Sequence, residues 1–374
     1  MSFLKIHHST CTVIPPHLQR HLAEHGDEEA REIVAATLHQ TARIVREREA
    51  TLIDTPRATR SRPRLRFVYD ARHTTTLTAR LVATECTFHI EDAEAKAAFD
   101  GSGAVFDFYA KVFNRNSIDD RGMPLISTVH YGKSFDNAMW NGRQMVYGDG
   151  DGKIFTGFTT IDVIGHEMSH GVTQADAALA YLGQTGALNE HLSDAFGIMI
   201  KQYWLALTAA ASNWLIGEGL LGPTIHGIAI RSMKAPGTAY DDPLLGRDPQ
   251  PAHMRDYVHA AEDNGGVHIN SGILNFAFYL FCVAVGGYSW MVPGSIWNEV
   301  RRTRLFPQAG FQDFANATVI VAGELYGVGG DVQMALTNAW TQVGIFVPVG
   351  LTKGGGGNLM GSPKWRNRPA EAHV

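Results

Sequence analysis

The stretch GHEMSHGV at residues 165–172 decides which fold this chain adopts. It contains the pattern His-Glu-x-x-His, in which His166 and His170 are four residues apart and share one face of a helix. Two imidazoles on one face can reach the same metal ion, and Glu167 lies beside them as a candidate base. With 17 histidines in 374 residues the pattern can also arise by chance, so a third ligand is needed to establish a metal site.

A candidate third ligand follows twenty residues later in GALNEHLSDAFG, residues 186–197. Glu190 and Asp194 are four residues apart and therefore share a helical face. Glu190 would complete a His, His, Glu set and leave the fourth position of a zinc ion open for water. Asp194 is placed to accept the other ring N–H of a metal-bound histidine. By themselves, these two carboxylates are more typical of a solvated helix face than of a metal site.

Composition sets broad limits on the protein class. The chain is 45% hydrophobic and 18% charged, as in globular proteins, and is long enough for two domains. Its net charge of -5 and pI near 6.4 provide no basic footprint for nucleic acid, so we expect no nucleic-acid partner. We also expect no membrane span, since no segment reads as one.

The N-terminal sequence MSFLKIHHSTCTVIPPH lacks the apolar run of a secretory signal peptide. This predicts a cytoplasmic protein, or one released by a route that needs no standard signal peptide. The three cysteines, Cys11, Cys86 and Cys282, are far apart and odd in number, which argues against a disulfide framework.

Sequence patterns divide the chain into four parts. Residues 17–53 show helical spacing, and the arginine-rich segment 55–66 reads as a linker. Strand-like runs surround a helical stretch at residues 92–113, and helical patterns dominate from residue 161. We therefore expect a propeptide (1–60), a β-rich domain that includes the HEMSH helix (61–176), a helical domain (177–349) and a disordered glycine-rich tail (350–374).

Several motifs together resemble the thermolysin family of zinc endopeptidases, the gluzincins. The motifs are HEMSH, GALNE with the following SD, DNAMWNGRQMVYGDGDG at residues 136–152, IRSM at 230–233, and EDNGGVHINSGILN at 262–275. They extend the resemblance over roughly residues 65–349. The resemblance implies an α+β fold of two domains, with zinc in the cleft between a β-rich and a helical half.

The resemblance also implies catalytic roles. His166, His170 and Glu190 would bind one zinc ion, and Glu167 would take a proton from water and pass it to the leaving amine. His268 and Tyr181 would stabilise the oxyanion, while Asp263 would orient His268 and Asp194 a zinc ligand. Without the resemblance, His268 reads as an ordinary core histidine.

Substrate contacts follow from the same resemblance. Asn137 and Ala138 on an edge strand would bond the substrate backbone, and Arg231 would hold the carbonyl just beyond the scissile bond. Read alone, Asn137 is typical of a turn and Arg231 of a surface charge. The pocket for the residue after the cut would be apolar and would prefer bulky apolar side chains; its residues are Phe155, Phe158, Val163, Ile216 and Ile230. The sequence thus predicts an endopeptidase rather than a peptide-binding pseudoenzyme or a hydrolase of small amides.

Two features depart from the secreted relatives. At the family's double calcium site the chain has Asp162, Lys201, Asn213, Leu215 and Glu218, so carboxylates are missing and we expect Lys201 to replace calcium. The leading segment CTVIPPHL, residues 11–18, is similar to the short propeptides of the protealysin-like subgroup. It predicts a zymogen inhibited by its own propeptide, in which Pro15 and Pro16 resist cleavage and Cys11 is a possible zinc ligand.

Overall fold

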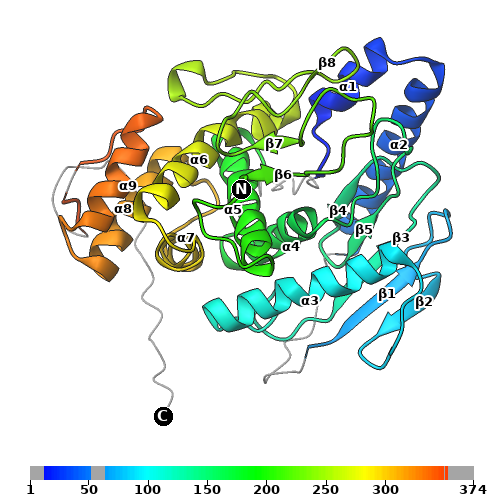
Figure 1. The fold of residues 1–374 in the computed structure, drawn as a ribbon, viewed down its shortest axis with the longest axis horizontal. Helices are drawn as coiled ribbons and strands as arrows, with labels where there is room; N and C mark the ends of the chain where they lie inside the picture. The colour runs from blue at the N-terminus through cyan, green and yellow to red at the C-terminus, as the bar shows by residue number, and fades with distance from the viewer. Residues whose placement is uncertain (1–11, 52–63, 349, 353–374) are drawn as a thin grey trace, which may run out of the picture.

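A computed structural model of the chain describes residues 12–51, 64–348 and 350–352. A β-rich half and a helical half lie on either side of two central helices, α4 (Ile161–Asp176) and α5 (Gly183–Trp204) (Figure 1). The α+β architecture expected from the sequence is confirmed. Most of the arginine-rich segment and the tail from residue 353 lie outside the described residues, as does Cys11.

The leading segment forms two helices, α1 (Pro16–His25) and α2 (Glu28–Thr51), as its apolar spacing indicates. Pro16 occupies the first helical turn, where its fixed φ angle favours the helix and its missing N–H costs nothing. Leu18 and Leu22, four residues apart on α1, are almost fully buried in the main core. The segment is therefore packed into the fold.

The β-rich half is built on one five-stranded mixed sheet with the order β2-β1-β3-β5-β4. Its strands are β1 (Arg66–Asp70), β2 (Arg80–Thr84), β3 (Leu125–Val129), β4 (Ala138–Trp140) and β5 (Met145–Tyr147). Strands β1, β3 and β5 run parallel to one another, whereas β2 and β4 are antiparallel to their neighbours. Strand β4 lies at one edge of the sheet.

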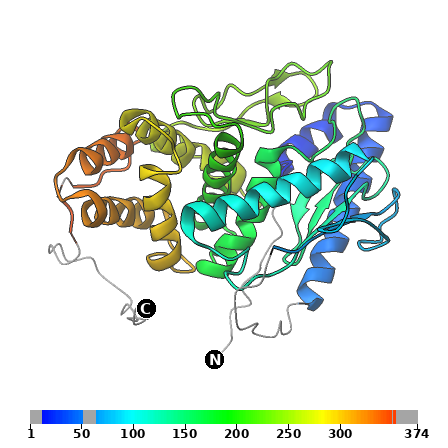
Figure 2. The ribbon, with the colours of Figure 1, turned by 60° about the horizontal axis from the view of Figure 1, so that its bottom comes forward.

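Alternation along β4 and β5 gives the sheet two apolar faces. Ala138 and Trp140 belong to the main core, whereas Met139 between them packs into a second cluster with Val146 and Ile44 of α2. Helix α3 (Ala93–Phe113) packs on β1 and β3 and crosses in front of the sheet in Figure 2. Helix α2 thus contributes to the second apolar cluster of the sheet.

The linker predicted at residues 55–66 does not extend to Arg66. Arg66, the last residue of the predicted linker, is the first residue of β1 and is 7% exposed. Its guanidinium bonds both carboxylate oxygens of Glu85, at 2.7 and 2.8 Å, and lies over the Phe99 ring at 3.6 Å. The reading of Arg66 as a residue too polar to pack was wrong, because it finds a carboxylate and an aromatic partner.

The helical half adds four long helices to the central pair. They are α6 (Asp263–Val285), α7 (Val292–Thr303), α8 (Phe311–Tyr326) and α9 (Asp331–Gln342). The connection between α5 and α6 carries the short elements β6 (Leu215–Ile216), β7 (Arg231–Ser232), β8 (Asp241–Asp242), β9 (Gly246–Arg247) and the 3-10 helix η1 (Met254–Asp256). Strands β6 and β7 pair antiparallel.

Two glycines let α4 and α5 approach closely. A Cβ atom on Gly165 would lie 3.1 Å from the Cα of Gly197, and one on Gly197 would lie 2.9 Å from the carbonyl oxygen of Asp162. Larger residues would force the helices apart. Since His166 follows Gly165 directly, this contact brings the HEMSH face against α5.

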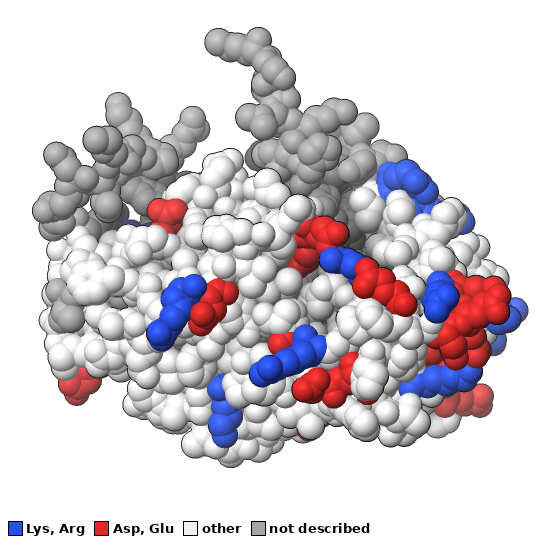
Figure 3. All heavy atoms as spheres, turned by 90° about the horizontal axis from the view of Figure 1, so that it is seen from above, with Lys and Arg blue, Asp and Glu red and all other residues white. Residues whose placement is uncertain are grey.

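Several surface charges of opposite sign lie next to each other. On α3, Lys96 pairs with Asp100 and Lys111 with Asp107, each four residues apart. The face in Figure 3 likewise shows basic and acidic side chains next to one another.

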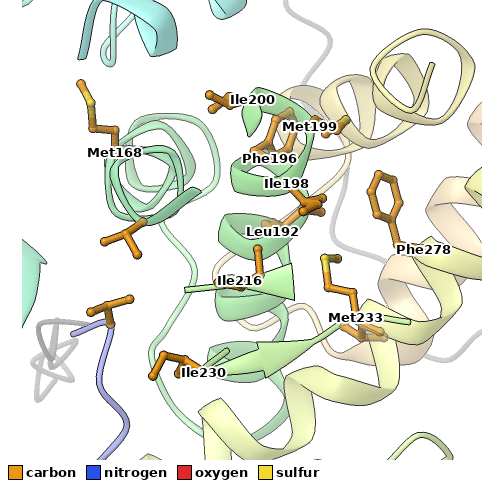
Figure 4. Close-up of a cluster of buried hydrophobic side chains, with 14 of the residues drawn as sticks. Met168, Leu192, Phe196, Ile198, Met199, Ile200, Ile216, Ile230, Met233 and Phe278 are labelled. Atoms are coloured by element: carbon orange, nitrogen blue, oxygen red, sulfur yellow. The ribbon is translucent and has the colours of Figure 1, made fainter. Parts of the chain in front are cut away.

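Helix α6 is long and apolar enough to cross a membrane, but 72% of its most apolar window is buried inside the protein. Its Phe278 faces apolar side chains of α5, which in turn pack toward Met168 of α4 (Figure 4). This burial identifies α6 as a core helix of the folded protein.

Candidate active site

The three expected metal ligands converge between α4 and α5. His166 and His170 extend from α4 and Glu190 from α5, and their ligand atoms lie within 4.8 Å of one another. The two Nε2 atoms are 3.0 Å apart, and each lies 3.5 Å from an oxygen of Glu190. All three side chains are buried, so the helix contact assembles a compact ligand set.

The partners of the two imidazoles fix their tautomers. His166 Nδ1 lies 2.8 Å from a carboxylate oxygen of Asp194, and His170 Nδ1 lies 2.9 Å from the side-chain oxygen of Asn189. Both partners accept hydrogen bonds, so each Nδ1 carries the proton and each Nε2 presents a lone pair. Two lone pairs that face each other at 3.0 Å repel unless a metal ion or a proton lies between them. The donor set therefore fits zinc, with one position open.

Glu167 lies in the same pocket. One carboxylate oxygen accepts the Trp140 backbone N–H at 2.8 Å, while Oε1 is buried and has no hydrogen-bond partner among the described residues. Burial raises the pKa of Glu167 well above its ordinary value. A buried carboxylate oxygen without a partner is suited to receive a proton from a bound water.

A tight turn at the start of α6 positions His268. Asp263, Asn264, Gly265 and Gly266 all have left-handed backbone angles, which asparagine and glycine tolerate. Asp263 accepts the backbone N–H of His268 at 2.9 Å and contacts its Nδ1 at 2.6 Å. Burial lowers the pKa of His268, but Asp263 and Glu190 outweigh it and raise the pKa to about 9. The two carboxylates therefore favour the protonated form of His268, in which Nε2–H can donate a hydrogen bond.

Tyr181 completes this side of the site. Its hydroxyl donates to Glu190 and lies 3.3 Å from His268 Nε2. The Tyr181 hydroxyl and His268 Nε2 thus both lie beside Glu190, the expected metal ligand on α5. Both are buried, so charge that develops between them is shielded from solvent.

Arg231 binds Asp194, the partner of the expected metal ligand His166. Its Nε and Nη2 donate to the two oxygens of Asp194 at 2.9 and 2.8 Å, and Asn275 donates to the same carboxylate at 2.8 Å. Burial acts to raise the pKa of Asp194, but Arg231 and His166 outweigh it and hold the pKa far below its ordinary value. Asp194 is therefore a fixed anion that orients both His166 and Arg231.

The residues predicted to bind the substrate backbone form hydrogen bonds with the leading segment of the same chain. Val13 donates its backbone N–H to the Ala138 carbonyl at 3.1 Å, and Ile14 donates to the Asn137 side chain at 3.0 Å. Arg231 Nη1 donates to the Val13 carbonyl at 3.4 Å. Val13 and Ile14 are fully buried, and these hydrogen bonds place both residues beside edge strand β4.

The predicted specificity pocket is apolar. Its five residues are no more than 1% exposed: Phe155, Phe158, Val163, Ile216 and Ile230. Ile216 pairs with Arg231 across β6 and β7, and Ile230 donates its N–H to the Ile216 carbonyl at 3.0 Å. Figure 4 shows Ile216 and Ile230 close together on this two-stranded segment.

Lys201 occupies the position expected for a substitute cation. Its Nζ lies 3.3 Å from Asp162, 3.0 Å from Glu218 and 3.1 Å from the Leu215 carbonyl oxygen. Asn213 donates to the same Glu218 oxygen at 2.8 Å. The ammonium group therefore binds both remaining carboxylates of the cluster.

Sequence reasoning missed several members of the site. Asn189 fixes the His170 ring, Asn275 supports Asp194, and the Trp140 backbone binds Glu167. Asn189 stands next to the ligand Glu190, which is a local signal, but only the crossing of α4 and α5 turns its side chain toward His170. Asn275 and Trp140 come from segments distant in the sequence, and no regular residue spacing connects them to the ligands.

Comparisons with known proteins match nearly the whole described chain. The family model described as "Thermolysin metallopeptidase, catalytic domain" matches residues 38–174, and "Thermolysin metallopeptidase, alpha-helical domain" matches residues 177–345. The "Extracellular metalloprotease" of Pectobacterium carotovorum subsp. carotovorum is 44% identical over 90% of this chain and 97% of its own length. "Protease PrtS" of Photorhabdus sp. (strain Az29) is 44% identical over 90% of this chain and 92% of its own length.

A solved structure supports the same relationship. The precursor of protealysin, a metalloproteinase from Serratia proteamaculans, matches with a TM-score of 0.82 at 46% identity, covering 90% of this chain and 99% of that one. The Pectobacterium relative is named as extracellular, so the expectation of a cytoplasmic protein was wrong. That expectation rested on the lack of a recognisable signal peptide, a weak basis because such reasoning detects only one export route.

Proposed function

Because this chain belongs to the thermolysin family of metallopeptidases, which are hydrolases that act on peptide bonds, we propose that it is a zinc-dependent endopeptidase produced as a self-inhibited precursor. The observation that carries this proposal is the pair of facing Nε2 lone pairs on His166 and His170, with Glu167 beside them. The name of the Pectobacterium relative supports action outside the cell.

His166, His170 and Glu190 would hold the zinc ion. When bound, zinc supplies Lewis acidity, which lowers the pKa of a water molecule and polarises a carbonyl group. The free Oε1 of Glu167 takes the proton from the attacking water and delivers it to the leaving amine. The Trp140 N–H holds the other oxygen, so the carboxylate keeps one orientation during the transfer.

His268 and Tyr181 would stabilise the charge that develops on the scissile carbonyl oxygen. Asp263 keeps His268 protonated and oriented, so that Nε2–H is available as a charged donor. A donor aimed at a developing oxyanion contributes about 3 kcal/mol to transition-state stabilisation. Tyr181 adds a second donor from the same side.

The contacts of residues 13 and 14 indicate how a substrate would bind. An extended peptide would pair with β4 through Ala138 and Asn137, and Arg231 would bind the carbonyl of the residue after the cut. Val13, whose carbonyl Arg231 binds here, takes that position in the precursor. We therefore infer cleavage on the N-terminal side of bulky apolar residues, because the five pocket residues named above offer no polar partner.

The precursor would be inhibited because its own segment occupies the substrate contacts. We propose residues 1–60 as the propeptide, 61–176 and 177–349 as the two catalytic domains, and 350–374 as a tail outside them. The match to a protealysin precursor over 99% of that chain supports a precursor form. Removal of the segment would open the cleft.

The test compares Glu167→Gln with wild type after the leading segment of both has been cut off by an added protease, which is then removed. The glutamine keeps the shape of the side chain but cannot take a proton, so zinc content should stay at one catalytic ion while turnover of a peptide library falls by about a thousandfold or more. Glu91→Gln on an exposed loop is the matched control and should retain full activity. Glu167→Gln turnover near the wild-type rate would rule out the mechanism, and cut sites that precede mainly Asp, Lys or Gly would rule out the specificity.

A further inference from the structure

A second group of metal-ligating side chains lies at the carboxyl ends of the parallel strands. His73 follows β1, His130 follows β3 and Asp149 follows β5. Parallel strands place their carboxyl ends at one edge of a sheet, so these three residues meet although the sequence separates them. None of them belongs to the catalytic ligand set.

The geometry of this group suits one ion. His130 Nδ1 lies 2.8 and 3.0 Å from the two Asp149 oxygens, and His73 Nδ1 lies 3.3 Å from Asp149 Oδ2. The ligand atoms of all three residues lie within 4.8 Å of one another. The His73 backbone N–H also donates to the His130 carbonyl at 2.9 Å, which holds the two loops together.

Asp92 gives His130 the second partner that a metal-bound histidine needs. Its Oδ2 lies 3.1 Å from His130 Nε2, while Oδ1 accepts the Ala95 N–H at 2.7 Å and caps α3. Donation from Nε2–H to this fixed carboxylate leaves Nδ1 with a lone pair that faces Asp149. A lone pair at 2.8 Å from a carboxylate oxygen is repulsive unless a cation or a proton lies between them.

A proton is the competing occupant of this position. A doubly protonated His130 would pair with Asp92 and Asp149 at once, as an imidazolium between two carboxylates. In that arrangement a neutral His73 would donate its Nδ1–H to the Asp149 oxygen that already contacts His130, so zinc content distinguishes the two occupants. Both histidines also have left-handed backbone angles, with φ of 58° for His73 and 52° for His130. Such backbone is often retained where geometry serves a site.

We propose that His73, His130 and Asp149 form a second, non-catalytic site for a divalent transition metal of the zinc class. Two imidazoles and a carboxylate are donors that zinc prefers, and water would fill the fourth position. The ion would tie together the loops that follow β1, β3 and β5. Helix α2 adjoins this region, because Arg43 donates to Thr75 in the same loop as His73.

The test measures zinc per chain in the full-length Glu167→Gln protein, in which self-cleavage is suppressed. Protein dialysed against buffered micromolar zinc should hold two ions per chain, and His73→Ala should hold one. His73 is 60% exposed at its side chain, so its removal leaves packing intact. His226→Ala is the matched control, because His226 is 79% exposed and 4.0 Å from a single carboxylate, Asp242; it should retain both ions.

Asp92→Asn provides an independent measure of the same site. Asparagine can still cap α3 through its side-chain oxygen, but it is a poorer acceptor for His130, so affinity for the second zinc should fall roughly 10- to 100-fold. Equal zinc content in the parent and His73→Ala proteins would overturn the proposal and leave a proton as the occupant. One ion in the parent and none in His73→Ala would support this site while contradicting the catalytic zinc, so the two proposals fail separately.

Discussion

Lys201 makes a prediction about stability that follows directly from its contacts. The Lys201 ammonium contacts Asp162, Glu218 and the Leu215 carbonyl, so it provides the positive charge that a calcium ion would supply to these oxygens. We expect the melting temperature of the wild-type protein to be independent of calcium. Replacing Lys201 with alanine should lower it, because two carboxylates lose their counter-charge.

The magnitude depends mainly on Asp162. Its side chain is 1% exposed, whereas that of Glu218 is 47% exposed and is largely compensated by water. Loss of one partner of a buried charge pair costs about 3 to 5 kcal/mol. Asp162 keeps the Gly217 N–H at 2.9 Å, so we expect about 3 kcal/mol. For a chain of this size that corresponds to a fall in melting temperature of roughly 4 °C.

Two further variants separate charge from packing. Lys201→Met keeps most of the side-chain volume without the charge and should be destabilised nearly as much as Lys201→Ala. Lys201→Glu adds a third carboxylate beside Asp162 and Glu218, so it should be less stable than wild type in a calcium chelator and regain stability in millimolar calcium. Calcium prefers such oxygen-rich sites, whereas the wild-type cluster repels it through the ammonium group.

The assay is a thermal scan in the Glu167→Gln background, where self-digestion does not distort the transition. Zinc is held constant and calcium is varied against a calcium-selective chelator. A wild-type melting temperature that rises by several degrees with calcium would show that Lys201 does not replace the ion. A Lys201→Ala protein as stable as wild type would show that the contacts contribute nothing.

The remaining predictions concern the metal shell and the leading segment. Asp194→Asn should weaken zinc binding roughly 10- to 100-fold, measured by zinc retention against a chelator, because it loses the anion that orients His166. Val13→Asp should accelerate self-processing on gels, since a charge enters an apolar pocket; unchanged processing would contradict the proposed register. Burial and nearby cations lower the pKa of His17 to about 3, so below pH 6.5 the released segment binds protons that the docked one excludes. Docking of the leading segment should therefore weaken about tenfold for each unit by which the pH falls below 6.5, measured by hydrogen exchange of α1. His17→Gln should remove this pH dependence of docking.

Sequence patterns could predict elements and ligands whose signals are local. The HEMSH spacing puts two imidazoles on one helical face, and Glu190 and Asp194 share a face of the next helix. Apolar spacing also indicated the two leading helices and the core helix α6. These features depend on neighbours three or four residues away, so one sequence is sufficient to reveal them.

Contacts between distant segments could not be predicted in the same way. Nothing near Arg231 in the sequence indicates that its guanidinium binds Asp194, because that contact requires β7 to lie beside the middle of α5. The linker reading of Arg66 was wrong for a similar reason, since Glu85 comes from the adjacent strand β2. The group of His73, His130 and Asp149 requires the register of three parallel strands.

The way the leading segment is held explains why a cut behind it should release it. Backbone N–H contacts with the β4 region end at Ile14, because Pro15 has no N–H to donate, so only a short piece of the leading segment is held there. The rest of the attachment comes from α1 and from Ile44 of α2, which packs behind the sheet. While the chain is intact, residues 52–63 keep these contacts intramolecular at high effective concentration. A cut in that segment makes docking bimolecular, so dilution alone then favours the open cleft. The activation by one cut that we propose would therefore need no rearrangement of the catalytic residues.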